Sequence, residues 1–93
     1  MKAIWKDIVL AESDDTTLVD GRHYFPRSSV RLEYLEKSKN IYHCPWKGYA
    51  DYYNIVVDGE VQHDAAWVYE HPYPEAQAVK GKFGFWKEVV IHE

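Results

Sequence analysis

The sequence predicts an all-β domain with one short helix and compact antiparallel sheets. Glycine and proline recur at short intervals, and the segments between them have the length of strands. These segments are rich in β-branched and aromatic residues, and aromatic side chains make up 16% of the chain. Because either half of a 93-residue chain is too small to bury its own core, we expect a single domain over residues 1–93.

The first third of the chain predicts short strands followed by the helix. Strands are expected over residues 3–5 and 8–11, and again at residues 18–19 and 23–25 on either side of the turn Asp20-Gly21. Pro26 ends the last of these strands. Ser28 or Ser29 can then cap a helix over residues 30–35, and a second helical turn is expected over residues 75–79.

The centre of the chain predicts a three-stranded meander. Strands over residues 40–44 and 49–57 are joined by the loop Pro45-Trp46-Lys47-Gly48. The pair Asp58-Gly59 is typical of a two-residue type I′ turn, so a third strand over residues 61–69 follows directly. The last strands are expected over residues 82–86 and 89–92.

The two-residue turn also predicts which residues face each other. Without a bulge, the cross-strand pairs on one face are Val56 with Val61, Asn54 with His63, Tyr52 with Ala65, and Ala50 with Trp67. This face carries less charge than the other, so we expect it to be the concave or core-facing side.

Composition excludes several classes of protein. Eleven basic against fifteen acidic residues give a net charge of −4, which argues against duplex nucleic acid as a partner. A single cysteine supplies neither an internal disulfide nor a paired-cysteine zinc site. No targeting segment and no apolar run of membrane length is visible, so a cytoplasmic protein without membrane contact is expected.

Cofactor motifs are also missing from the sequence. The five histidines lack the spacing of metal ligands, and neither glycine-rich phosphate-loop pattern occurs. We therefore predict no metal and no cofactor. The oligomeric state stays open, with a homodimer as one option.

The candidate site lies around the central loop. In the predicted sheet, Cys44, Lys47, Tyr52 and Trp67 converge at one end, and the small alanines beside the two rings leave room for a pocket. Lys47 can hold a phosphate or carboxylate, or can be a solvated loop lysine. Arg27 at the start of the predicted helix can bind an anion, or can pair with a surface acid.

A catalytic role is the alternative for the same residues, although no catalytic residue can be assigned. Cys44 is either a nucleophile or a small buried side chain, and His43 points to the opposite face of its strand. Asp51 and Asp64 share the more polar face of the predicted sheet and are the candidate acid/base partners.

Several blocks together resemble, in order and spacing, the domain-of-unknown-function family number 427. The most specific are Cys44-Pro45-Trp46-Lys47-Gly48 and Asp64-Ala65-Ala66-Trp67, supported by Ala11-Glu12-Ser13, Tyr24-Phe25-Pro26-Arg27 and Gly81-Lys82-Phe83-Gly84-Phe85-Trp86. The resemblance implies a β-tent fold, found in small, mostly bacterial or fungal proteins and related in shape to zinc-bearing domains with an aromatic pocket. The paired cysteines of those domains are absent here, so the architecture is implied without the zinc.

The resemblance also implies a pocket lined by Arg27, Cys44, Lys47, Tyr52 and Trp67. Its cations and rings suit a small anionic, planar ligand such as a nucleotide or cyclic nucleotide. The alternative function is a small nucleotidyltransferase- or hydrolase-like enzyme that uses Cys44 or Lys47 with an acidic partner.

Overall fold

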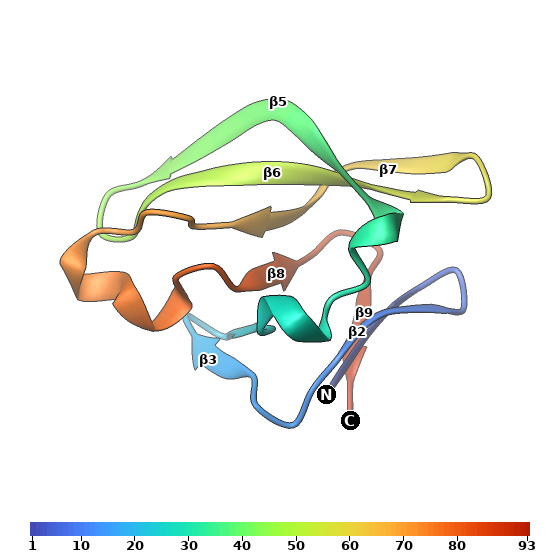
Figure 1. The fold of residues 1–93 in the computed structure, drawn as a ribbon, viewed down its shortest axis with the longest axis horizontal. Helices are drawn as coiled ribbons and strands as arrows, with labels where there is room; N and C mark the ends of the chain where they lie inside the picture. The colour runs from blue at the N-terminus through green and yellow to red at the C-terminus, as the bar shows by residue number, and fades with distance from the viewer.

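Three antiparallel sheets make up the computed structural model, which describes residues 1–93, and they confirm the predicted all-β class. One sheet has the order β2 (Ile8–Glu12), β1 (Lys2–Trp5), β9 (Val90–His92); the second is the hairpin of β3 (Thr17–Val19) and β4 (Arg22–Tyr24); the third has the order β5 (Leu35–Cys44), β6 (Gly48–Val57), β7 (Glu60–Val68), β8 (Phe83–Phe85). In Figure 1, β5, β6 and β7 of the third sheet lie across the top, β8 and then β3 lie below them, and the two chain ends lie side by side.

The β6–β7 hairpin keeps the predicted turn but not the whole predicted register. Asp58 and Gly59 both have positive φ, at 51° and 79°, and Val56 faces Val61 as expected. Further along, a bulge makes Asn54 face three residues of β7, and Tyr52 therefore pairs with Trp67 instead of Ala65. Because the shift is two residues, Trp67 and the other residues beyond the bulge stay on their predicted faces. Asp64, within the bulge, lies beside Asn54 and not on the face of Asp51 as predicted.

Strand β5 is longer than predicted and is also bulged. Its first residues pair with β6 up to Lys37, opposite Tyr53, and pairing resumes at Ile41, opposite Asp51. The three residues between them, at positions 38–40, face the single Tyr52. Two bulges thus flank β6 at neighbouring positions, one on each side of the strand.

The predicted helix over residues 30–35 is wrong. The chain instead forms two 3-10 turns, η1 (Arg27–Ser29) and η2 (Leu32–Tyr34), and β5 begins directly afterwards. Val30, between the turns, is extended at φ −100° and ψ 133° and bridges to Ala11. Short helices gain most of their stability from packing, and here pairing with distant strands overrides the local helical signal.

The predicted serine cap is also absent. Neither turn has a side-chain cap, and Ser29 Oγ donates to the Pro26 carbonyl at 2.7 Å instead. The second expected helical turn is confirmed as the 3-10 segment η3 (Pro74–Val79). None of these helical segments is long and apolar enough to cross a membrane.

The main core lies on the face of β6 that carries Ile55 and Val57, opposite the face that was expected to be core-facing. The predicted concave face instead carries a smaller buried cluster around Ala50 and an open cavity. Phe25 and Phe83 exchange two backbone hydrogen bonds at 2.8 and 2.9 Å. This bridge fixes the end of β4 to β8 and thereby holds the β3–β4 hairpin against the third sheet.

Candidate functional site

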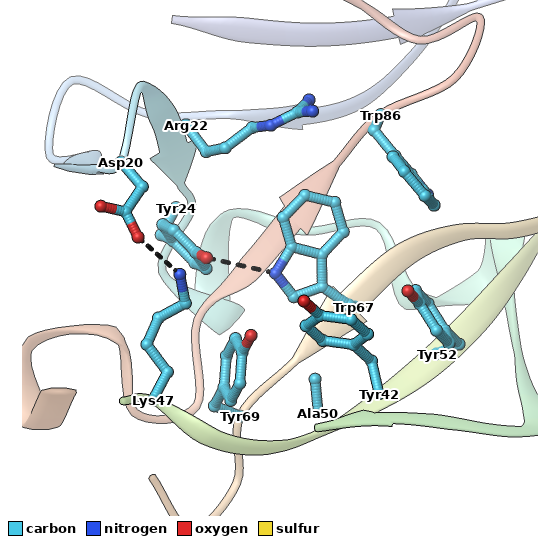
Figure 2. Close-up of a pocket in the computed structure, with 10 residues that line it drawn as sticks. All are labelled: Asp20, Arg22, Tyr24, Tyr42, Lys47, Ala50, Tyr52, Trp67, Tyr69 and Trp86. Atoms are coloured by element: carbon cyan, nitrogen blue, oxygen red, sulfur yellow. Dashed lines mark hydrogen bonds and ion pairs between the residues drawn. The ribbon is translucent and has the colours of Figure 1, made fainter. Parts of the chain in front are cut away.

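A cavity with a volume of about 300 Å³ lies on the face of the third sheet that the β3–β4 hairpin approaches (Figure 2). The third sheet and the loops at its strand ends contribute three tyrosines and one tryptophan, the hairpin contributes a fourth tyrosine and two charged residues, and the segment after β8 contributes a second tryptophan. Its lining residues are Asp20, Arg22, Tyr24, Tyr42, Lys47, Ala50, Tyr52, Trp67, Tyr69 and Trp86. We call this cavity the aromatic pocket.

The floor of the aromatic pocket follows from strand alternation. Tyr52 and Trp67 are direct cross-strand partners, and Ala50 follows on the same face of β6, opposite Tyr42. Gly84 faces Trp67 from β8, and a β-carbon at Gly84 would lie 2.4 Å from the indole ring. The indole therefore occupies its place only because this position is glycine.

The rings of the pocket are oriented by one another. Trp67 Nε1 donates to Tyr24 Oη at 3.3 Å, and these two rings meet edge to face at 84°. Trp86 meets Trp67 edge to face at 85° and lies nearly parallel to Tyr52, at 9°. Burial raises the pKa of the Tyr52 and Tyr69 phenols, so both hydroxyl groups are neutral at neutral pH.

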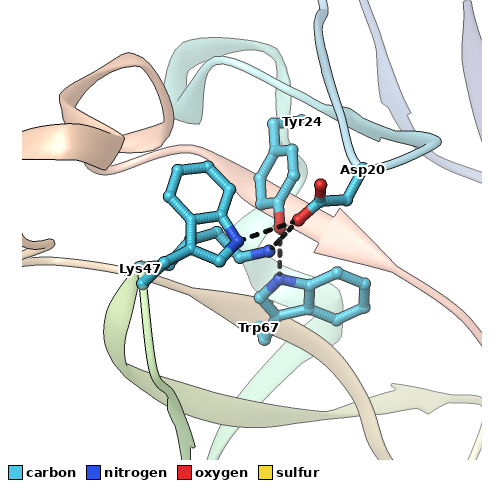
Figure 3. Close-up of polar contacts among 5 residues, drawn as sticks. Asp20, Tyr24, Lys47 and Trp67 are labelled. Atoms are coloured by element: carbon cyan, nitrogen blue, oxygen red, sulfur yellow. Dashed lines mark hydrogen bonds and ion pairs between the residues drawn. The ribbon is translucent and has the colours of Figure 1, made fainter.

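A buried lysine closes one end of the pocket (Figure 3). Lys47 is only 7% exposed, and its Nζ lies 2.8 Å from Asp20 Oδ2. Burial alone would lower the pKa of Lys47, but the hydrogen bond to Asp20 and the nearby Tyr24 and Cys44 outweigh it, so the pKa is raised. The same bond, with help from Trp46 Nε1 at 3.2 Å, lowers the pKa of Asp20. Lys47 and Asp20 are therefore both charged at neutral pH.

Arg22 is the second cation at the pocket, and it has no acidic partner. Its Cζ lies 5.8 Å from the centre of the Trp67 ring, and Figure 2 shows its side chain extending above that ring. Four ion pairs form in the protein, and Arg22 belongs to none of them. Two cations line the pocket, Lys47 and Arg22. Only Arg22 is free of an ion pair within the protein, so its charge is available to a ligand.

The structure brings together three of the five residues predicted for the site. Lys47, Tyr52 and Trp67 line the aromatic pocket. Arg27 does not: its Nη2 binds Glu70 Oε2 at 2.7 Å, and its guanidinium lies 5.0 Å from the Phe83 ring. Cys44 is buried at 7% exposure in the small cluster with Ala50 and does not line the cavity either.

The proposed acid/base carboxylates also lie outside the aromatic pocket. Asp51 pairs with Val68 on the face of β6 opposite Tyr52, and Asp64 sits within the β7 bulge. The side chains of His, Cys, Asp and Glu nowhere gather in a group of three that could hold a metal ion.

Sequence reasoning missed most of the pocket wall. Asp20, Arg22 and Tyr24 come from the β3–β4 hairpin, whose turn was visible in the sequence but whose docking position was not. A usable signal was the alternation of Arg22 and Tyr24, which places both side chains on one face of β4. The other lining residues that were missed are Tyr42, Tyr69 and Trp86.

A comparison with known protein families identifies the family of this chain. The family model described as "Domain of unknown function (DUF427)" matches residues 1–93, which is the whole chain, so the chain belongs to this family. No curated protein matches the sequence at a significant level.

Proposed function

We propose that this member of the DUF427 family binds a small, planar, anionic ligand, such as a nucleotide or cyclic nucleotide, in the aromatic pocket. The observation that carries the proposal is the unpaired guanidinium of Arg22 above the Trp67 ring, at the mouth of a cavity walled by aromatic rings. A flat ring can stack on the aromatic walls while an attached phosphate or carboxylate binds Arg22.

The size and charge of the pocket support this class of ligand. Its volume of about 300 Å³ is at the lower end of the range for small-molecule sites. Arg22, Lys47 and Asp20 together give the lining a charge of +1, in a protein whose net charge is −4. The pocket therefore attracts an anion locally, although the protein as a whole is acidic.

The alternative function, a small enzyme using Cys44 or Lys47, has less support. A nucleophilic lysine needs a lowered pKa, whereas the pKa of Lys47 is raised by its bond to Asp20. Cys44 does not line the cavity, so a substrate in the pocket would not meet its thiol. We therefore favour a binding module over a catalyst.

The proposal is tested by calorimetric titration and thermal unfolding with a panel of nucleoside monophosphates and cyclic nucleotides. We expect at least one of them to raise the melting temperature, whereas sulfate at equal charge does not. Arg22→Gln should weaken that binding about tenfold, as expected for loss of a charge-assisted hydrogen bond. Arg31→Gln is the matched control, because Arg31 is exposed and does not line the pocket. No binding across the panel at millimolar concentration would overturn the proposal.

A further inference from the structure

A second hollow of about 360 Å³ lies next to the aromatic pocket. Its lining is entirely polar and consists of Ser38, Lys39, Asn40, Asn54, His63 and Asp64. We call it the bulge hollow, because all of these residues except Asn54 belong to the two bulges that flank β6.

The two hollows share one face of the sheet. Tyr52 and Asn54 are alternate residues of β6, so their side chains leave the strand on the same side. Trp86 links the hollows, since it lines the aromatic pocket and its Nε1 donates to the backbone carbonyl of Asp64. Burial raises the pKa of Tyr52, and the negative charge of Asp64 raises it further.

The bulges hold Asp64 in a specific arrangement. Asp64 has φ +53°, in the left-handed region that aspartate adopts more readily than most residues. It is held there because its backbone N–H donates to Asn54 Oδ1 at 2.9 Å and its Oδ2 accepts from Asn40 Nδ2 at 2.7 Å. Bulges of this kind recur beside functional sites.

These two hydrogen bonds also fix the orientation of both amides. Asn40 must turn its Nδ2 to the carboxylate, which leaves its Oδ1 as an acceptor with no partner in the protein. Asn54 must turn its Oδ1 to the backbone N–H, which leaves its Nδ2 as a donor with no partner in the protein. The two amides therefore offer the bulge hollow a donor and an acceptor of defined orientation, beside Asp64 Oδ1, a buried carboxylate oxygen that also has no partner in the protein.

We infer that the bulge hollow is the second half of the same binding site and reads the edge of a heterocyclic ring that carries a donor beside an acceptor, as a nucleobase does. This inference rests on the proposed function and narrows the class of ligand to heterocycles with a polar edge. Stacking on aromatic rings tolerates any flat ring, whereas amide groups directed at the ring edge select among them. A heterocycle that stacks on Tyr52 or Trp86 would direct its polar edge towards Asn40 and Asn54. Its anionic group would then point towards Arg22.

The test compares nucleoside monophosphates with 1-naphthyl phosphate, which has a flat ring and a phosphate but no polar ring edge. For the wild-type protein, calorimetric titration should show at least one nucleotide binding about tenfold more tightly than 1-naphthyl phosphate. Asn40→Ala should remove this advantage and leave the affinity for 1-naphthyl phosphate unchanged. Gln62→Ala, which removes an amide from β7 outside both hollows, should change neither affinity.

The outcomes separate this inference from the proposed function. Equal wild-type affinities for the nucleotides and 1-naphthyl phosphate, or a nucleotide advantage that survives Asn40→Ala, would overturn the inference alone. Binding of neither kind of ligand would overturn the proposed function and the inference together. The wild-type comparison decides the inference even if Asn40→Ala fails to fold.

Discussion

The main core and the aromatic pocket both contain aromatic residues, but they use them differently. In the core, Phe25, Phe83 and Phe85 are at most 2% exposed. The rings of Phe25 and Phe85 meet edge to face, with 5.7 Å between their centres. These rings have no polar atoms that require a partner, so they can be enclosed completely.

The rings of the pocket all belong to tyrosine and tryptophan, whereas three of the four buried rings of the main core belong to phenylalanine. Tyr42 is 48% exposed, and the large rings of the pocket lie against the smallest side chains available, Ala50 and Gly84. A cavity forms where small residues face large ones and the rings carry polar atoms that need not be buried. The enclosed rings of the core serve stability, whereas partly exposed rings such as Tyr42 are those that the proposed ligand would contact.

The comparison is tested most strongly by Phe83→Ala. Phe83 is fully buried and contacts both Phe25 and Tyr53, so its loss leaves a cavity in the main core. We expect the free energy of unfolding to fall by about 3–5 kcal/mol, measured by urea denaturation. Tyr42→Ala, which removes a ring of similar size from the pocket, should cost less than about 1 kcal/mol. Equal losses would remove the distinction between the two regions.

Gly84→Ala is expected to have the next largest effect. The added β-carbon would meet the Trp67 ring at 2.4 and 2.5 Å, and a ring held between two strands cannot move aside freely. The clash should lower the free energy of unfolding by about 1–3 kcal/mol and change the near-ultraviolet circular dichroism of the tryptophans.

A double-mutant cycle shows whether Trp67 causes this loss. Trp67→Phe places a smaller ring opposite position 84, so Gly84→Ala should cost less in that background than in the wild type. Strictly additive losses would mean that the glycine is needed for some reason other than the indole.

Local features of the fold could be predicted from the sequence, whereas the docking of the β3–β4 hairpin on the third sheet could not. The turns at Asp20-Gly21 and Asp58-Gly59 are set by neighbouring residues, and both have the expected positive φ angles. Alternation correctly placed Tyr52 and Trp67 on one face, because a shift of two residues preserves the face. The bulges themselves depend on bonds between Asn40, Asn54 and Asp64 across three strands, which no local pattern shows.

The candidate site was predictable to the same extent. Lys47, Tyr52 and Trp67 belong to one meander, and their proximity follows from its local turns. Arg22 reaches the pocket through the bridge of Phe25 to Phe83, residues far apart in the sequence. The sequence predicted Arg27 as the anion-binding arginine because it precedes the expected helix. Only the structure shows that Arg27 is paired with Glu70 and that Arg22 lines the pocket instead.

The smallest expected effect comes from the ion pair at the edge of the pocket. The pKa of Asp20 is lowered in the folded protein, so its charge stabilises the fold above the unfolded pKa near 3.8, and this contribution is lost as the pH falls through the folded value. The pKa of Lys47 is raised, so its contribution is complete below 10.5 and is lost only as the pH rises through the folded value. Asp20→Asn should therefore be less stable than the wild type at neutral pH, by an amount that shrinks in acid.

Urea unfolding from about pH 6 down to about pH 2.5 measures this difference. Asp15→Asn is the matched control, since Asp15 is exposed and belongs to no ion pair. A difference between Asp20→Asn and the wild type that stays constant over this range would mean that Asp20 acts through its shape or its contact with Trp46. Lys47 would then be held in the pocket wall by its packing, because its charge would gain nothing from the carboxylate.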